Sequence, residues 1–300
     1  MINVLLFDNW NKYEGFSEGS GRSEKIWLES RNHEIGVFKY PKVDNDGRVS
    51  STEHISEHMA SKIAKIIDIP VAEIDIGFRN QRIGCLSHLI ASNIEEGVNY
   101  ISRKYPSFDN NNLVARENGL HYCIEMLEMS MREYIDDSEW FIPMMIFDFV
   151  IGNSDRHQSN WAMQTTQEGR VSLCPLYDNG SSLCSFISDS ATESYLGKDK
   201  LRFTSLVTTK SRSRIRINGY EKREPSHNDV LKHLLENYYS TRPLCEKIEQ
   251  VLTKEEIEKI VFQYQDDLLS NNKKELIKRF INAKIEEMRR LVLEVSYGKK

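Results

Sequence analysis

The sequence predicts an α+β fold in two lobes, a small β-rich lobe over residues 1–90 and a larger helical lobe over residues 91–300. Short apolar runs bounded by turn residues dominate the first part, whereas helical periodicity dominates the second. The length supports this division, because 300 residues with 39% hydrophobic content bury a large core as one large domain or two lobes.

Strand and helix signals alternate in the small lobe. Strands are expected over residues 25–28, 34–40, 71–76 and 82–89. The first two flank a polar turn at residues 30–33 and predict a β-hairpin. Residues 53–67 switch to helical spacing, with Thr52 as the expected N-cap. The apolar side chains of this helix share one face: Ile55, Met59, Ile63 and Ile66. The small lobe is therefore expected to be a mixed sheet that carries one helix.

The large lobe is expected to consist mainly of helices. Helical periodicity covers residues 113–134, 139–151, 227–240, 243–250 and 253–296. The last stretch is expected to break near Ser270, where Asn271 and Asn272 follow.

Two polar segments carry the strongest functional signal. In the first, residues 153–160, Asp155 and Asn160 lie five positions apart, as in the catalytic loop of a protein kinase. In the second, Asp178 follows an apolar run and precedes Asn-Gly. Either segment alone reads as a turn, because Asp, Asn and Gly favour turns. Together and in this order they predict phosphoryl transfer, with Asp155 orienting the attacking hydroxyl and Asn160 and Asp178 as metal ligands.

A glycine- and serine-rich loop precedes the predicted hairpin. Its backbone is suited to approach phosphate oxygens, because glycine carries no Cβ. The residues assigned to nucleotide binding in this loop are Gly19, Ser20, Gly21 and Ser23. The loop does not match a Walker motif, and ordinary surface loops share its composition.

Lys39 lies inside an apolar strand and therefore needs a partner. A kinase uses such a lysine to hold the nucleotide phosphates, paired with a glutamate on the following helix. Glu57 is the first candidate for that glutamate and Glu53 the second. The alternative is a lysine on an edge strand whose head reaches solvent.

Three further residues are assigned to the ATP site by their position. Residues 84–89 end the small lobe, and a connector there would offer backbone groups to an adenine edge, which places Leu86 and His88 beside the nucleotide. His157 is interpreted as an imidazole that orients the catalytic loop, because no second His or Cys stands at metal-ligand spacing.

Composition excludes several other classes of protein. The net charge of −5 and pI near 6.0 argue against direct nucleic-acid binding. Five cysteines without a Cys-x-x-Cys pair indicate reduced thiols, not a zinc site or a disulfide framework. The first ten residues do not read as a signal peptide, and no run reaches membrane-spanning length. A cytoplasmic protein is expected, with leaderless secretion or delivery to a host left open.

The motif Asp155-Arg156-His157-x-x-Asn160, followed by Tyr177-Asp178, resembles the signature of the HipA-like serine/threonine kinases. It is especially similar to compact members that lack an extra N-terminal subdomain. The resemblance implies a bilobal protein-kinase-like fold, ATP and Mg²⁺ as cofactors, Asp155 as catalytic base, Asn160 and Asp178 as magnesium ligands, and Lys39 as phosphate anchor. It also implies autophosphorylation in the Gly/Ser loop, where Ser20 and Ser23 stand closest. The chain departs from many relatives at Ser159, where they carry a basic residue.

The leading hypothesis is thus an ATP- and Mg²⁺-dependent protein serine/threonine kinase, either a toxin with an antitoxin partner or an effector. Phosphatidylinositol kinases carry a similar loop, which keeps a lipid or small-molecule kinase as an alternative. A catalytically silent kinase-like interaction module is a third. A basic run over residues 210–216 suits an acidic protein substrate or an RNA-bound target, or is a disordered solvated loop.

Overall fold

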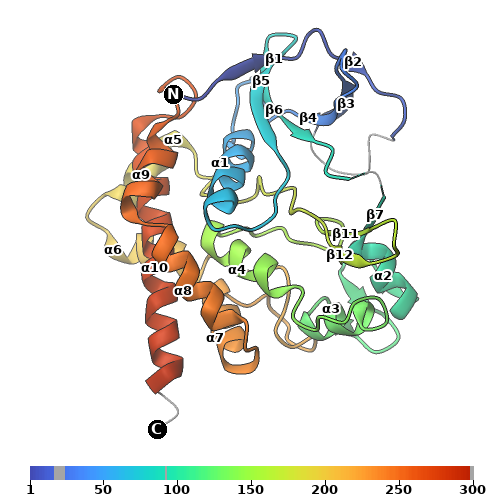
Figure 1. The fold of residues 1–300 in the computed structure, drawn as a ribbon. Helices are drawn as coiled ribbons and strands as arrows, with labels where there is room; N and C mark the ends of the chain where they lie inside the picture. Colours follow the sequence, from blue (N-terminus) through green and yellow to red (C-terminus); the bar gives the residue numbers. More distant parts are fainter. Residues whose placement is uncertain (17–23, 92, 298–300) are drawn as a thin grey trace.

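The computed structural model describes residues 1–16, 24–91 and 93–297, and it confirms the predicted α+β fold (Figure 1). A six-stranded sheet lies at one end of the molecule, in the order β1-β5-β6-β4-β3-β2. Its strands are β1 (Val4–Leu6), β2 (Asn11–Lys12), β3 (Lys25–Glu29), β4 (Ile35–Lys39), β5 (Ile74–Arg79) and β6 (Arg82–His88). All neighbours are antiparallel except β1 and β5, which run parallel.

The predicted hairpin and helix of the small lobe are both present. β3 and β4 pair in register from Lys25↔Lys39 to Glu29↔Ile35. Helix α1 (Glu53–Ile66) buries its apolar face against the large core. Thr52 precedes the helix as expected, but its hydroxyl donates to the Ser185 carbonyl and makes no capping bond.

Side chains alternate between the two faces of this sheet, which separates its core from its polar site. One face holds a small cluster of Phe7, Leu28, Phe38 and Leu86. Lys39 and Cys85, paired across β4 and β6, are each one position away from Phe38 and Leu86 and point to the opposite face. The predicted lobe boundary at residue 90 lies between β6 and the next strand, β7 (Ile94–Glu96).

The remainder of the described chain is mainly helical, with two small sheets. Its helices are α2 (Gly97–Lys104), α3 (Ile124–Met131), α4 (Ile142–Ile151), α5 (Asp189–Leu196), α6 (Lys200–Val207), α7 (His227–Asn237), α8 (Thr241–Val251), α9 (Lys254–Phe262) and α10 (Asn271–Tyr297). Its strands are β7 (Ile94–Glu96), β8 (Phe108–Asp109), β9 (Val114–Ala115), β10 (Leu120–His121), β11 (Ala162–Thr165) and β12 (Val171–Leu173). The predicted break before the last helix is confirmed, because α10 begins at Asn271.

The predicted helix over residues 113–134 is wrong in its first half. Only Ile124–Met131 is helical there, whereas β9 and β10 form a short hairpin before it. Gly119 takes a positive φ of 69° in the hairpin turn, and the Asn118 side chain accepts a hydrogen bond from the Leu120 amide. Turn chemistry therefore overrides the helical spacing of the apolar residues.

Helix α4 forms the centre of the helical part, as Figure 1 shows, and leads into the polar segment at 153–160. All of its residues except Pro143 are buried. It ends at Gly152, whose φ of 66° is the left-handed conformation that terminates many helices. The Gly152 amide donates back to the Asp148 and Phe149 carbonyls. The catalytic-loop candidate is thus fixed to a rigid, buried helix.

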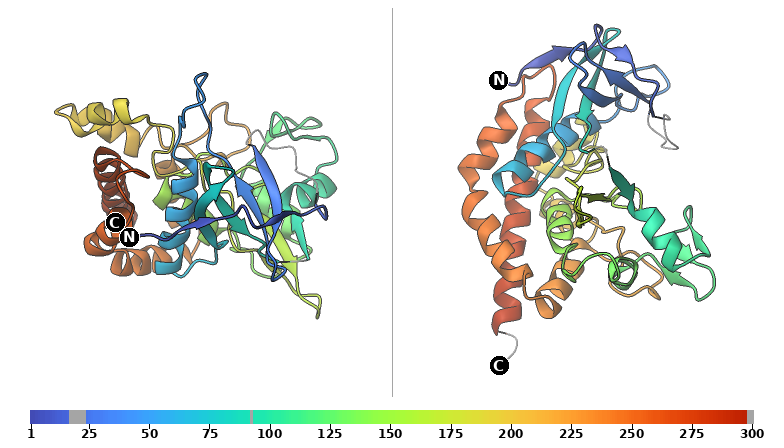
Figure 2. Two further views of the ribbon diagram at one scale, coloured as in Figure 1. Left: turned by 90° about the horizontal axis from the view of Figure 1, so that it is seen from above. Right: turned by 45° about the vertical axis from the view of Figure 1, so that its right-hand side comes forward.

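Helix α9 packs beside α1, and the turn that follows it contacts both α1 and the N-terminal residues (Figure 2). A buried hydrogen bond of 2.7 Å links the His58 ring on α1 to the Tyr264 hydroxyl after α9. The Ile2 amide donates to the Gln263 carbonyl at 3.0 Å, and the Gln265 side chain donates to the Ile2 carbonyl at 3.1 Å. Helix α1 is therefore held from the sheet on one side and from the C-terminal helices on another.

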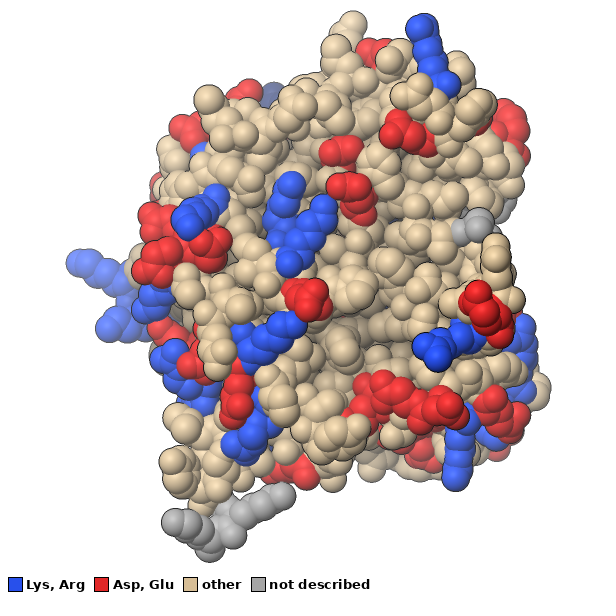
Figure 3. All heavy atoms as spheres, viewed as in Figure 1, with Lys and Arg blue, Asp and Glu red and all other residues tan. Residues whose placement is uncertain are grey.

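Acidic and basic side chains are interspersed over the face of the molecule shown in Figure 3. All five cysteines are free, and four of them are buried. Within the ranges that the structure describes, no helix is both long and apolar enough to cross a membrane.

Candidate active site

The structure brings together three residues that lie far apart in the sequence. The Lys39 ammonium on β4 lies 2.9 Å from Asp178 Oδ1 and 3.6 Å from Glu57 Oε2 on α1. Of the two glutamates proposed as partners of Lys39, Glu57 occupies this position. Glu53 pairs instead with Lys42 at 3.0 Å.

The opposite charges of Lys39 and Asp178 stabilise each other's ionised form. Burial alone would lower the pKa of Lys39, but the charges of Asp178 and Glu57 outweigh it and hold that pKa above its ordinary value. Lys39 in turn lowers the pKa of Asp178, which keeps this carboxylate ionised. Burial raises the pKa of Glu57, whose side chain is almost fully enclosed.

Glu57 also fixes the backbone beside Asp178. Its Oε1 accepts a hydrogen bond of 2.9 Å from the Asn179 amide. A Cβ on the next residue, Gly180, would lie 3.2 Å from Glu57 Oε2, a contact tighter than most side chains accept. Asp178 itself takes a φ of 56°, which is uncommon for a residue other than glycine. Glycine at position 180 therefore permits the close approach of α1 to this turn.

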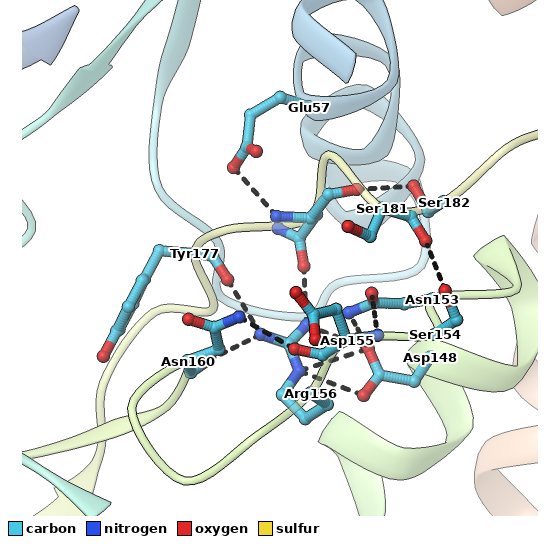
Figure 4. A network of polar contacts seen from close by, with 11 residues as sticks. Glu57, Asp148, Asn153, Ser154, Asp155, Arg156, Asn160, Tyr177, Ser181 and Ser182 are labelled. Carbon is cyan, nitrogen blue, oxygen red and sulfur yellow. Dashed lines mark hydrogen bonds and ion pairs between the residues drawn. The ribbon is translucent and has the colours of Figure 1, made fainter. Parts of the chain in front are cut away.

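A buried arginine holds the two polar segments against each other (Figure 4). Arg156 is 1% exposed, and its Nε and Nη2 donate to the Asp148 carboxylate on α4. Its Nη1 donates to the Asn160 carbonyl at 2.6 Å and the Tyr177 carbonyl at 2.8 Å. Nη2 also donates to Asn179 Oδ1 at 2.6 Å. Arg156 is thus a structural cation that aligns Asn160 with Asp178.

Asp155 and Asn160 are linked through the backbone of their loop. Asn160 Nδ2 donates to the Asp155 carbonyl at 2.8 Å, and the Asp155 amide donates to Asn153 Oδ1 at 3.1 Å. The Asp155 carboxylate is partly exposed. Burial raises its pKa, against the opposing charges of His157 and Arg214. Asp155 thus lies in a hydrogen-bonded loop, and its carboxylate is accessible to a substrate.

Asn160 and Asp178 carry oxygen atoms of the kind that magnesium binds. Because Asn160 Nδ2 is committed to the Asp155 carbonyl, the amide oxygen of Asn160 is left as its free ligand. Among the described residues there is no cluster of three or more His, Cys, Asp or Glu side chains that would hold a metal alone. One carboxylate and one amide oxygen suit Mg²⁺ that shares its remaining ligands with phosphates and water.

Three residues that the sequence assigns to ATP lie in different surroundings. Leu86 is fully buried in the middle of β6, on the sheet face opposite Lys39. His88 ends that strand and pairs with Asp75 at 2.8 Å. These surroundings do not test whether Leu86 and His88 bind ATP, and that role stays a prediction. His157 Nδ1 accepts from the Ser159 amide at 3.2 Å within the loop.

Gly19, Ser20, Gly21 and Ser23 lie outside the described residues. The sequence reasoning also missed residues that complete the site, namely Asp148, Asn179, Arg214 and Glu224. For Asp148 a signal existed, because a lone carboxylate in an apolar helix needs a buried partner.

Comparisons with known proteins show the family and the fold of this chain. A family model described as HipA-like C-terminal domain matches residues 19–237. The serine/threonine-protein kinase CtkA of Helicobacter pylori is 23% identical over 184 residues, which cover 60% of this chain and 55% of that relative. This chain therefore aligns with little more than half of the length of that curated relative.

Two solved structures share the fold. The crystal structure of the Helicobacter pylori proinflammatory kinase CtkA matches with a TM-score of 0.79 and 16% identity, over 97% of this chain and 99% of that chain. A chain from the Shewanella oneidensis MR-1 complex of toxin–antitoxin proteins HipA and HipB with operator DNA matches with a TM-score of 0.58 and 14% identity. That match covers 98% of this chain and 69% of the other. The kinase-like fold predicted from the sequence is confirmed.

Proposed function

Because the chain belongs to the HipA-like C-terminal domain family, we propose that it is an ATP- and Mg²⁺-dependent protein serine/threonine kinase. The observation that carries the proposal is the convergence of Lys39, Glu57 and Asp178, since Lys39 and Asp178 are 139 residues apart in sequence and 2.9 Å apart in space. A structural ion pair alone would not require Asp155 and Asn160 beside it.

Each residue has a defined role in this proposal. Lys39, oriented by Glu57, binds nucleotide phosphates, and Asn160 and Asp178 hold Mg²⁺, which neutralises phosphate charge. Asp155 accepts the proton of the acceptor hydroxyl. The hydroxyl oxygen forms a bond to the γ-phosphorus, the bond from that phosphorus to the β–γ bridging oxygen breaks, and its electron pair leaves with ADP.

The test of this function is the removal of the proposed base. Asp155→Ala is expected to lower phosphate transfer by about 10²- to 10⁴-fold, the usual contribution of a general base, and to leave ATP affinity unchanged. The measurement is transfer of labelled γ-phosphate from Mg-ATP to the protein itself and to myelin basic protein. Asp267→Ala, an exposed carboxylate elsewhere, is the matched control.

Two outcomes would replace the proposal. An Asp155→Ala variant as active as Asp267→Ala would exclude the assigned base. A wild-type protein that binds Mg-ATP but labels neither acceptor would favour the silent interaction module, and transfer to lipid vesicles alone would favour the lipid kinase.

Autophosphorylation in the Gly/Ser loop is a second part of the proposal. A phosphate on Ser20 or Ser23 adds roughly −1.5 to −2 charge, which would repel the phosphates of ATP. After incubation with Mg-ATP, mass spectrometry is expected to find phosphate within residues 17–23 of the wild type and not of Asp155→Ala. The phosphorylated form is expected to bind ATP more weakly. Equal labelling of both proteins would point to another kinase in the preparation.

An antitoxin partner belongs to the same proposal. The Shewanella relative was solved with HipB and operator DNA, and a toxin of this type would be held inactive by such a partner. For a serine/threonine kinase the substrate is a protein of the cell in which it acts, and the acceptor is a serine or threonine hydroxyl.

A further inference from the structure

Among the described residues of its own loop, none donates a hydrogen bond to the carboxylate of Asp155, although the ring of His157 lies near it. The hydrogen bonds within that loop engage only its backbone, through Asn153, His157 and Asn160. Among the described residues, its ion-pair partner is Arg214, whose Nε lies 3.8 Å from Asp155 Oδ1. That arginine comes from a later segment of the chain, beyond helix α6.

Other cations near Asp155 are engaged elsewhere. Arg156 is buried against Asp148. Lys42 pairs with Glu53 at 3.0 Å. The Nε of Arg214, by contrast, is buried without a hydrogen-bond partner among the described residues. It is therefore a donor that remains available to the carboxylate of Asp155, in addition to the ring of His157 in the same loop.

Arg214 is itself held in place. Its Nη1 donates to Glu224 Oε1 at 2.6 Å. The backbone on both sides is pinned, since the Ser213 amide donates to the Pro225 carbonyl at 3.0 Å and the Arg216 amide donates to the Tyr122 carbonyl at 3.0 Å. The neighbours of Arg214 on either side, Ser213 and Ile215, are buried. The segment is thus a packed element, not the solvated loop that the sequence left open.

We propose that Arg214, tethered by Glu224, is a positioning residue that aims the Asp155 carboxylate at the acceptor hydroxyl. The proposal rests on the proposed function. A carboxylate partly open to solvent samples several rotamers, whereas a fixed guanidinium on one side favours a single one. Because proton acceptance needs close alignment, a small loss of orientation lowers the rate of the chemical step more than substrate binding.

The experiment compares variants of this segment in the transfer assay with myelin basic protein. Arg214→Met is expected to lower kcat by about 10- to 100-fold, while the KM for ATP and the KM for myelin basic protein stay near the wild-type values. Arg214→Lys keeps the charge and is expected to recover part of kcat. Glu224→Gln is expected to lower kcat less than Arg214→Met does. The fold-loss in kcat of the double variant Arg214→Met/Glu224→Gln is expected to be smaller than the product of the two single fold-losses, because both substitutions act through one contact.

Arg223→Met is the matched control, since Arg223 is an exposed arginine of the same segment. Thermal unfolding of each variant reports whether the fold is kept. If Arg214→Met and Arg223→Met have equal kcat and the wild type is active, the positioning role is overturned and the proposed function is not. An effect confined to the KM for myelin basic protein overturns the positioning role too, and assigns Arg214 to substrate binding. A wild type that transfers no phosphate removes the proposed function, and this inference with it.

Discussion

Asp178→Ala is expected to lower phosphate transfer by about 10³-fold, because a bound metal contributes several kcal/mol of charge stabilisation in such reactions. The substitution removes the carboxylate that we assign to Mg²⁺, and it also removes the closest anion of Lys39. Mg-ATP affinity is therefore expected to fall together with the rate. Labelled-phosphate transfer gives the rate, and isothermal titration calorimetry gives the affinity.

Asp178→Asn separates the two roles of this residue. An amide can still accept a hydrogen bond from Lys39, but it carries no charge for the metal. We expect Asp178→Asn to keep the binding of ATP measured without Mg²⁺, and to lose the enhancement that Mg²⁺ gives. A variant whose ATP affinity still rises normally on addition of Mg²⁺ would show that the metal binds elsewhere.

Arg156→Met is expected to lower the free energy of unfolding by about 3–5 kcal/mol, the usual effect of leaving a buried charge without its partner. The guanidinium is the shared donor for Asp148, Asn179 and two backbone carbonyls. Its loss leaves the Asp148 carboxylate buried, with the Asn153 side-chain amide as its remaining donor among the described side chains. Urea denaturation followed by circular dichroism measures the change.

The double variant Arg156→Met/Asp148→Leu tests the physical cause. Because neither charge then remains in the core, stability is expected to return toward the wild-type value. Phosphate transfer is not expected to return, since Asn160 and the Asp178 turn have lost their common anchor. If the double variant is as unstable as Arg156→Met, the hydrogen bonds to the backbone, not the ion pair, dominate the stability of this site.

Local patterns were sufficient for much of the fold and for the centre of the site. The helix at residues 53–66 was predictable because its apolar face has a clear period, and it carries Glu57 where the argument from Lys39 required a partner. A lysine in an apolar strand demands an anion, and this demand follows from the residue types alone. The resemblance to HipA-like proteins, based on the Asp155–Asn160 motif, is confirmed by the family match.

Other features had no local signal. The parallel pairing of β1 with β5 depends on a long return of the chain, and nothing in Val4–Leu6 specifies that partner. The contact of Arg214 with Asp155 also had no local signal. An arginine in a basic run is expected to be a solvated charge, whereas the neighbours of Arg214 are buried in the structure. The apolar residues after position 113 have helical spacing, but the turn at Asn118 and Gly119 favours a hairpin there.

The bond between His58 and Tyr264 has a consequence for how this protein is made. The two residues are 206 positions apart, and the ribosome synthesises the chain from its N-terminus. Contacts of such long range form late, because the intervening chain must first be ordered. Lys39 and Glu57 are therefore among the first residues of the site to be synthesised, whereas α1 is expected to gain its contact with Tyr264 only after the rest of the site has been made. A nascent or truncated chain that ends before α9 has no means of securing α1 from this side.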